Sequence, residues 1–388
     1  MQPVRIAGVA VTPFGDHSES TGRELFAKAS TDALTDSGVH RADIDEVLYG
    51  NFIGEVTESQ GHQGPLAAEV VGTNAAATRF ESACASGGVA LRAGVRAVRS
   101  GDADVVLVGG MERMSHVDVG GVTDALALAA DDVHERRVGM TFPGAYALLT
   151  RAYFREYGGT REDLAAVAVK NHDNALANEN AHLRERISTE DVLTAPAIAE
   201  PVGLYDACPI SDGAAAVVLV SDEYADANDL DASVAVTGTG QRSDTLALQR
   251  RLDRAYTPAT EHAAADAYDE AGITPADVDL VEVHDCFTIA EVLAIEALGF
   301  YDPGAGIDAA ATGETTREGG LPVNLSGGLK AKGHPVGATG VAQLVELTKL
   351  LRGDHHHSDS VPDAEVGLAH NAGGTVASAV VHVVEVVA

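Results

Sequence analysis

The stretch ASTDALTDSGVHRADIDEV at residues 29–47 lines up with AAADAYDEAGITPADVDLV at residues 263–281. Each stretch predicts a helix that ends at a glycine, Gly38 or Gly272, followed by a short turn and a strand. The similarity indicates that two distant parts of the chain contain related structural units.

A second pair of matches follows in the same order. Residues 88–90 and 101–102 of the first part correspond to residues 340–342 and 353–354 of the second. In each part a helix is expected to begin after a glycine-rich turn. We therefore predict an internal duplication of an α/β unit, with a largely parallel core sheet covered by helices.

The duplication divides the chain into three regions. Residues 1–116 and 206–257 are expected to form the first α/β half, which a strand over residues 234–239 completes. Residues 258–388 are expected to form the second half. Residues 117–205 have charged runs and no counterpart in the second half, so we interpret them as an inserted helical and loop domain.

The chain is strongly acidic, with 58 Asp and Glu against 26 Lys and Arg and a formal net charge of −32. The acidic residues are scattered over predicted helix faces and turns, which is typical of a solvated surface in a high-salt, halophilic cytoplasm. At molar salt the Debye length is about 3 Å, so repulsion within such a surface would be screened. The charge argues against nucleic acid as a partner.

No segment is expected to cross a membrane, because the longest apolar stretches, such as Val105–Gly110 and Val376–Val383, are only strand-length. The N-terminus lacks a signal-peptide pattern, so a cytoplasmic location is expected. The three cysteines are widely spaced and predict neither a disulfide framework nor a metal site. The tract His355–His357 lacks further ligands at suitable spacing and is expected to be a solvated loop.

Cys84 lies in the small-residue stretch SACASGG at residues 82–88, which opens a predicted helix. A thiol at a helix N-terminus meets the positive end of the helix dipole and free backbone N–H groups, which favour the thiolate and can bind an oxyanion. Cys84 is therefore a candidate acyl-accepting nucleophile. The alternative is a small buried cysteine in a tight turn.

Histidines gather at turns of the second half. The triplet His284–Cys286 follows a predicted strand, and its histidine aligns with Gly50 of the first half. His334 lies between a glycine and a proline in a glycine-rich loop, and the pair His370-Asn371 follows another strand. Each histidine alone could be a satisfied loop residue, but four such turns together indicate an active site.

These four turns, in this order, resemble the thiolase family, and most closely its sterol-carrier-protein-type and archaeal branch. The resemblance is carried by Cys84 before a helix, by HDCF at 284–287, by GHPVGATG at 333–340, and by HNAG at 370–373 in place of the C-x-G loop of other thiolases. It covers essentially the whole chain. It implies the thiolase fold, a five-layered αβαβα arrangement of two similar halves, with an inserted loop domain for coenzyme A binding.

The resemblance also implies roles for the candidate residues. Cys84 would take the acyl group, and His334 would activate it and help to bind the thioester oxygen. Cys286 would act as acid and base on the second substrate, with His370 as the other candidate base. His284 stands where other thiolases have an Asn that holds an oxyanion-hole water.

Coenzyme A thioesters would be substrates, and neither a cofactor nor a metal is implied. Further substrate-binding residues are expected at Met140, His172, Ser326, Gly327, Asn371 and Gly373.

The implied activity is acetyl-CoA C-acetyltransferase, the reversible condensation of two acetyl-CoA to acetoacetyl-CoA and coenzyme A, feeding isoprenoid (mevalonate) synthesis. The alternatives are a 3-ketoacyl-CoA thiolase of fatty-acid degradation or polyhydroxyalkanoate synthesis, a decarboxylating or hydroxymethylglutaryl-type condensing enzyme, and a non-catalytic scaffold subunit. The implied partners are a second copy of the chain, in a homodimer or tetramer, an OB-fold zinc-ribbon protein and hydroxymethylglutaryl-CoA synthase.

Overall fold

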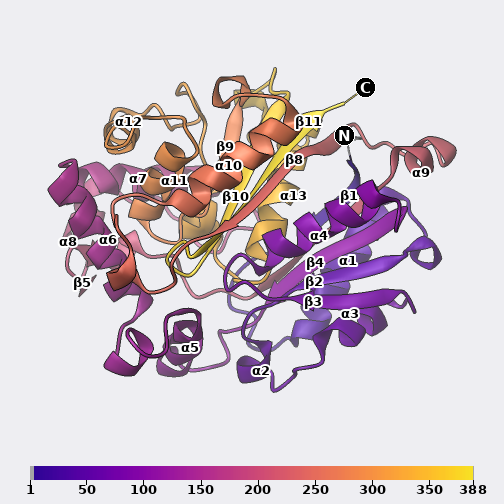
Figure 1. Cartoon of the computed structure of the whole chain (residues 1–388), viewed down its shortest axis with the longest axis horizontal. Coiled ribbons are helices and arrows are strands. Elements are labelled where there is room, and N and C mark those ends of the chain that lie inside the picture. Colours follow the sequence, from indigo (N-terminus) through magenta and orange to yellow (C-terminus); the bar gives the residue numbers. More distant parts are fainter. Residues whose placement is uncertain (1–3, 388) are drawn as a thin grey trace.

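A computed structural model describes residues 4–387 and contains one mixed sheet of nine strands, ordered β3-β2-β4-β7-β1-β8-β11-β10-β9 (Figure 1). The strands of this sheet are β1 (Val4–Val11), β2 (Glu46–Gly50), β3 (Ala76–Phe80), β4 (Val105–Glu112), β7 (Gly213–Val220), β8 (Val234–Ser243), β9 (Leu280–Glu282), β10 (Val366–Gly373) and β11 (Ser378–Val386). The short strands β5 (Ala197–Ala199) and β6 (Val202–Gly203) form a separate pair.

The predicted duplication is confirmed. Helix α1 (Gly22–Ser37) ends at Gly38 with a φ of 69°, and α10 (Pro258–Ala271) ends at Gly272 with a φ of 78°, left-handed conformations that glycine adopts readily. A short 3₁₀ turn then leads into β2 in the first half and into β9 in the second. The two halves of the sheet meet where β1 pairs with β8.

Two details of the predicted sheet are wrong. Only the pairs β2–β3, β2–β4 and β9–β10 are parallel, and the others are antiparallel. Strand β8 pairs with β11 along its whole length and is the counterpart of β1, so it belongs to the second half and not to the first. The alternation of apolar residues shows that a strand is present, but it does not show which strand will be its neighbour.

The two halves of the sheet lie on opposite sides of a middle layer of helices, and further helices cover each half on its outer face. This arrangement gives the five layers expected. Alternate residues of β4 point to opposite faces, so Val106 and Val108 join the central core while Val105 and Leu107 join an outer core. Helices α4 (Ser86–Ser100) and α13 (Thr339–Arg352) fill the middle layer between the two halves.

The outer layers hold the remaining helices of each half. In the first half these are α1, α2 (Gly54–Thr57), α3 (Gln63–Val71) and α9 (Asp222–Ala227). In the second half they are α10 and α11 (Thr288–Ala297), and α12 (Gly306–Thr312) packs on α11 and on the inserted region. A π-helix, η7 (Gly328–Lys332), precedes the loop that carries His334.

The inserted region leaves the sheet after β4 and returns at β7. It holds α5 (Val119–Leu126), α6 (Phe142–Glu156), α7 (Arg161–Ala175) and α8 (Thr189–Thr194). Figure 1 shows the magenta helices α6 and α7 beside the orange helices α11 and α12 of the second half, and the side chains of these four helices share one apolar cluster. This part of the insertion therefore packs on the half that carries the histidine loops, whereas α5 packs beside Phe52 and Ile53 of the first half.

The tract His355–His357 is not the solvated loop that was predicted. His355 and His357 are buried, and only His356 is exposed. Nε2 of His355 lies 3.0 Å from Glu346, and Nε2 of His357 lies 2.9 Å from the Asn174 carbonyl. Within residues 4–387, no helix combines the length and the apolar character that a membrane crossing requires.

Candidate active site

Cys84 lies in a tight turn between β3 and α4. The preceding residue, Ala83, has a left-handed backbone with a φ of 50°, which costs free energy in a residue that has a Cβ. The Ser86 hydroxyl closes the turn by accepting from the Ser82 N–H at 3.0 Å and donating to the Ala83 carbonyl at 2.6 Å. The turn presents Cys84 two residues before α4 begins.

The Cys84 thiol is protonated at neutral pH. Burial raises its pKa to about 12, although the Gly374 backbone N–H lowers the pKa in part. The expectation that the helix end would favour the thiolate is therefore wrong for the free protein, because loss of water around the sulfur outweighs the helix dipole.

Cys84, His284 and His334 come together from three separate loops. The Cys84 sulfur and one ring nitrogen of each histidine lie within 4.8 Å of one another. The two imidazole rings are 4.9 Å apart and nearly perpendicular, at 85°. Both histidines are buried, and Nε2 of each has no hydrogen-bond partner in the described part of the chain. We refer to these three residues as the Cys-His-His cluster.

Both histidines of the cluster are neutral, and each is oriented by a contact at its Nδ1. Burial lowers the pKa of His334 to about 3 and lowers that of His284 well below its ordinary value. Nδ1 of His334 lies 2.7 Å from the Thr339 hydroxyl, and Nδ1 of His284 lies 3.0 Å from Nδ2 of Asn371. In each ring Nε2 is thus the nitrogen left to act on a molecule bound at Cys84.

Cys286 is buried beside the cluster. Burial raises its pKa well above the ordinary value, and the neighbouring Cys208 and Cys84 thiols raise it further. The Tyr146 hydroxyl contacts Cys286, lowers its pKa in part, and donates to the Gly374 carbonyl at 3.0 Å. The arrangement places a second, protonated thiol close enough to Cys84 for the two to interact electrostatically.

His370 and Asn371 are consecutive residues of β10 and face opposite sides of the sheet. Asn371 faces the cluster. Nε2 of His370 lies 3.0 Å from the hydroxyl of Thr260 in α10, in the outer layer of the second half. The two predicted candidate bases therefore differ in position, with Cys286 beside the cluster and His370 turned away from Asn371.

Gly373 allows close packing of two turns. A Cβ at Gly373 would lie 2.4 Å from the Ser82 carbonyl, so no larger residue fits against the nucleophile turn. Met140 lines a small cavity together with Phe142 and Thr375, the residue that follows Gly374. Gly373 and Met140 thus lie near the turn that contacts Cys84.

The other predicted binding residues are engaged within the protein. The Ser326 hydroxyl donates to Glu282 at 2.6 Å, and Gly327 has a φ of 102° and packs against Ala175. The buried His172 ring has Nδ1 3.0 Å from the Glu185 carbonyl and Nε2 3.4 Å from Nζ of Lys330. Their contact with a substrate remains a prediction.

Two buried carboxylates that were given no role anchor the loops. Asp285 accepts from the Leu329 N–H and from Nδ2 of Asn171, both at 2.6 Å, and so fixes the HDCF turn against η7. Glu112 accepts from Gly337 of the loop that carries His334, at 3.1 Å. The signal for Glu112 was present in the sequence, because it is a charged residue at the end of an otherwise apolar strand.

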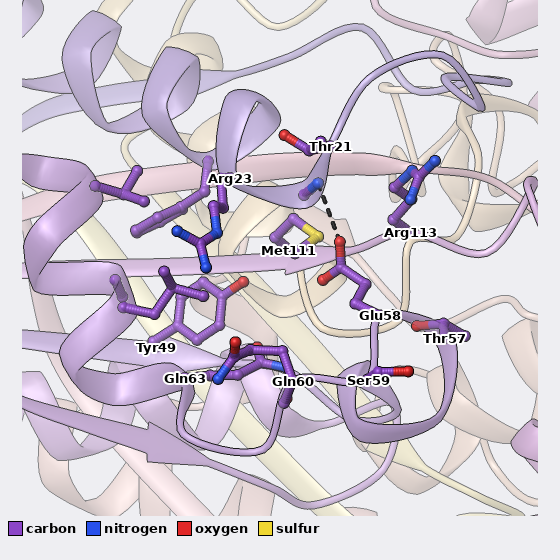
Figure 2. A pocket seen from close by; sticks show the side chains of 15 residues that line it. Thr21, Arg23, Tyr49, Thr57, Glu58, Ser59, Gln60, Gln63, Met111 and Arg113 are labelled. Carbon is purple, nitrogen blue, oxygen red and sulfur yellow. Dashed lines mark hydrogen bonds between the residues drawn. The ribbon is translucent and has the colours of Figure 1, made fainter.

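A separate cavity of about 340 Å³ lies on the other face of the sheet, between the start of α1 and the segment that follows α2. Figure 2 shows Glu58 in this cavity, where it accepts from the Gly22 N–H at 3.0 Å. Met111 lines the cavity, whereas its neighbour Glu112 points toward the cluster side. None of the predicted site residues lines this cavity.

Comparison with known proteins gives matches along nearly the whole chain. The family model "Thiolase, N-terminal domain" matches residues 4–223, and "Thiolase C-terminal domain-like" matches residues 240–386. The chain is 44% identical over 384 residues to an acetyl-CoA acetyltransferase of Methanothermobacter thermautotrophicus, with 99% of each chain covered. It is 39% identical over 397 residues to an acetyl-CoA acetyltransferase of Methanocaldococcus jannaschii, again with 99% of each covered.

The solved structure of an "Ltp2-ChsH2(DUF35) aldolase" is similar, with a TM-score of 0.84 and 25% sequence identity, and the alignment covers 99% of this chain and 98% of that one. The break between the two family models falls near the start of β8, which agrees with a second half that begins there.

Proposed function

Since the chain belongs to the thiolase family, we propose that it is an acetyl-CoA C-acetyltransferase, which condenses two acetyl-CoA to acetoacetyl-CoA and coenzyme A through an acyl group on Cys84. The observation that carries the proposal is the Cys-His-His cluster, in which the Cys84 sulfur and one ring nitrogen of each histidine lie within 4.8 Å of one another. Nε2 of each histidine has no hydrogen-bond partner among the described residues. A condensation of this kind needs a covalent acyl carrier, a base and oxyanion donors.

The first half-reaction loads Cys84. Its sulfur attacks the thioester carbonyl while its proton passes to Nε2 of His334, which is neutral and unpartnered. When the carbon–sulfur bond to coenzyme A breaks, Cys286 donates its proton to the departing thiolate. The raised pKa of Cys286 supports this order, because the residue begins the cycle as a thiol.

The second half-reaction uses the Cys286 thiolate so formed. It removes a proton from the methyl carbon of the second acetyl-CoA, and the resulting carbanion attacks the acyl carbonyl on Cys84. The new carbon–carbon bond forms, Cys84 leaves as thiolate, and His334 returns the proton to it. The position of His370 against Thr260 supports Cys286 as the carbon base.

A cationic segment supports binding of the coenzyme A phosphates. Arg250 is exposed and has no ion-pair partner among residues 4–387. Its neighbour Arg251 donates to the Thr375 carbonyl at 2.6 Å, next to the Gly374 N–H that contacts Cys84. In a chain with a net charge of −32, a cation here gives an anionic substrate a local binding site.

The insertion contributes to the same surface. Glu135 accepts from the Leu248 N–H at 2.7 Å and so holds the exposed Arg136 and Arg137 beside the 248–254 segment. Reversing the charge of Arg250 would raise the KM for acetyl-CoA with a smaller effect on kcat, since the phosphates lie far from the reacting carbon.

Partners form the second part of the proposal. Strand β3 is at the edge of the sheet, and no strand among residues 4–387 pairs with its outer side, which supports a homodimer formed by addition of a second copy. Exposed apolar side chains on the two segments that Glu135 joins support a further protein partner, and these are Val133, Val138, Leu246 and Leu252. The name of the similar aldolase includes a DUF35 component, which also supports a second protein at this fold, and the OB-fold zinc-ribbon protein is the partner proposed here.

Acetoacetyl-CoA formation is thermodynamically uphill, so an enzyme that consumes the product would draw the reaction forward. This supports hydroxymethylglutaryl-CoA synthase, and hence isoprenoid synthesis, as the downstream step.

The experiment is an assay of the purified protein at about 2 M KCl, where the surface charge is screened. Condensation of acetyl-CoA and thiolysis of acetoacetyl-CoA are measured side by side. Cys84→Ser should lower turnover by at least about 10³-fold, because a hydroxyl is a far weaker nucleophile than a thiolate. Cys208→Ser changes the cysteine that takes no step in this mechanism, so it is the matched control and should lower turnover far less than Cys84→Ser.

Turnover only with a malonyl thioester, or only with acetoacetyl-CoA plus acetyl-CoA, would contradict the proposal in favour of another condensing enzyme. Failure of acetyl-CoA to acylate Cys84 would indicate a scaffold subunit. Thiolysis of long-chain 3-ketoacyl-CoA in preference to acetoacetyl-CoA would indicate a degradative thiolase.

A further inference from the structure

The Asn371 side chain is buried and uses every hydrogen-bonding group that it has. Nδ2 donates to the Cys84 carbonyl at 3.1 Å and lies 3.0 Å from Nδ1 of His284. Oδ1 accepts from the Gly88 N–H at 3.2 Å. One side chain thus joins the nucleophile turn, the HDCF loop and the first turn of α4.

These contacts fix which end of the amide is which. The Gly88 N–H can only donate, so it must face Oδ1, and the Cys84 carbonyl can only accept, so it must face Nδ2. Turning the amide over would set oxygen against oxygen at Cys84 and an NH₂ group against the N–H of Gly88. Both errors would be buried, where unpaired polar groups are costly.

The orientation of the amide fixes the proton on His284. Nδ1 faces an N–H donor and must carry a lone pair, so a neutral His284 has its proton on Nε2. Nε2 is the ring nitrogen that has no protein partner among the described residues. His284 therefore offers a hydrogen-bond donor to whatever oxygen is bound at Cys84.

His334 has the opposite arrangement. The Thr339 hydroxyl donates to the Pro335 carbonyl at 3.1 Å, so it must accept from Nδ1–H of His334 at 2.7 Å. Nε2 of His334 then carries the lone pair. The cluster therefore holds one donor nitrogen and one acceptor nitrogen, each set by a neighbour that does not touch the reacting atoms.

We propose that Asn371 is a positioning residue that holds His284 in its Nε2–H tautomer, so that His284 donates to the thioester oxygen while His334 accepts the Cys84 proton. The catalytic part of this inference rests on the proposed function, whereas the tautomer does not. The same constraint opposes metal binding by the Cys-His-His cluster, because Nε2 of His284 has no lone pair to offer.

The test is ¹⁵N NMR of histidine-labelled protein without substrate, with the His284 signals identified by their loss in His284→Asn. In the wild type, Nε2 of His284 should have the shift of a protonated ring nitrogen and Nδ1 that of an unprotonated one. Asn371→Asp places an acceptor against Nδ1 and should exchange the two shifts. With one oxyanion donor lost, kcat should fall by about 10²- to 10³-fold with little change in KM.

Gln343→Glu is the matched control. Gln343 is another buried amide, and it donates to the His370 and Glu282 carbonyls at 2.9 and 3.3 Å without touching the cluster. The same amide-to-acid change there should leave the His284 shifts as they are in the wild type. This control measures how far the His284 shifts change when a buried amide away from the cluster becomes an acid.

A wild-type His284 protonated on Nδ1 would overturn the inference even if the protein is an active thiolase. Unchanged His284 shifts in folded Asn371→Asp would also overturn it. If Asn371→Asp fails to fold, Asn371→Ser, which removes the donor to Nδ1 without adding a charge, should give His284 signals that report both tautomers. Signals of a single Nε2–H tautomer in that variant would overturn the role of Asn371. An inactive wild type with the expected tautomer would instead reject the proposed function alone.

Discussion

Glu112→Gln tests whether a buried carboxylate at the end of β4 holds the active-site loops together. The Glu112 side chain is 0% exposed, and each of its two carboxylate oxygens accepts two hydrogen bonds. Oε1 accepts from Nδ2 of Asn51 at 2.9 Å and from the Ile53 N–H at 3.2 Å. Oε2 accepts from the Phe52 N–H at 2.9 Å and from the Gly337 N–H at 3.1 Å.

Glutamine keeps the shape of the side chain but replaces one oxygen with a donor. Whichever way its amide lies, two buried N–H groups face NH₂ and lose their acceptor. Each such loss costs about 1–3 kcal/mol, so the two losses together would lower the free energy of unfolding by about 2–6 kcal/mol. Part is regained because the amide is neutral, whereas burial raises the pKa of Glu112 to about 8 and so opposes its charge. The comparison is therefore made at about pH 9, above this pKa, where Glu112 is ionised and both of its oxygens can accept. We expect a net loss of about 2–4 kcal/mol.

The same substitution should lower kcat. Gly337 lies three residues from His334, and small misplacements of a catalytic group can cost about 10²-fold in rate. The free energy of unfolding would be measured by urea denaturation at about 2 M KCl, with kcat measured in the same buffer. The control is Glu58→Gln, since Glu58 accepts only the Gly22 N–H among the described residues and lies on the other face of the sheet. An unfolding free energy within about 0.5 kcal/mol of the wild type, with unchanged kcat, would refute the reasoning.

Three further outcomes follow from the structure. Alkylation of Cys84 by iodoacetamide, followed by peptide mass spectrometry, should accelerate about tenfold per pH unit from about pH 7 to pH 10, because its pKa is raised to about 12; a plateau below about pH 8 would mean a resting thiolate. Gly340→Ala should lower the free energy of unfolding by about 1–3 kcal/mol, because its Cβ would lie 2.3 Å from Oδ1 of Asn371. Gly61→Ala, whose Cβ would have its nearest atom 3.7 Å away, should be neutral. Equal effects of the two substitutions in urea denaturation would contradict the close packing at Gly340. The melting temperature should rise from dilute to molar KCl as the charge of −32 is screened, and a flat or falling trend would contradict the interpretation of the surface.

The parts of the site that the sequence could predict depend on local signals. Gly38 and Gly272 mark helix ends because their left-handed conformation is a property of one residue. Cys84, His284 and His334 stood out because reactive side chains at strand ends and helix starts seldom serve packing alone.

The parts that could not be predicted depend on contacts between distant residues. Glu112 and Gly337 are 225 positions apart, and no pattern near either residue indicates the other. The protonation state of Cys84 was predicted wrongly for the same reason, because the helix end is local but burial is a property of the whole fold. The neighbours of β8 were likewise beyond what its own alternation could indicate.

The two halves share a backbone fold, but equivalent positions differ in the room they leave for a side chain. Gly88 and Gly340 are equivalent, and a Cβ at either would approach Oδ1 of Asn371, at 2.8 and 2.3 Å, so the starts of α4 and α13 converge on one amide. At the other equivalent pair, a Cβ at Gly50 would lie 2.7 Å from the backbone of Gly87, whereas the second half has room there for the whole side chain of His284. The first half therefore cannot supply the donor that the second half supplies. Cys84 from the first half and the two histidines from the second half meet at this position. The proposed chemistry therefore depends on a histidine in one half where the equivalent position of the other half is a closely packed glycine.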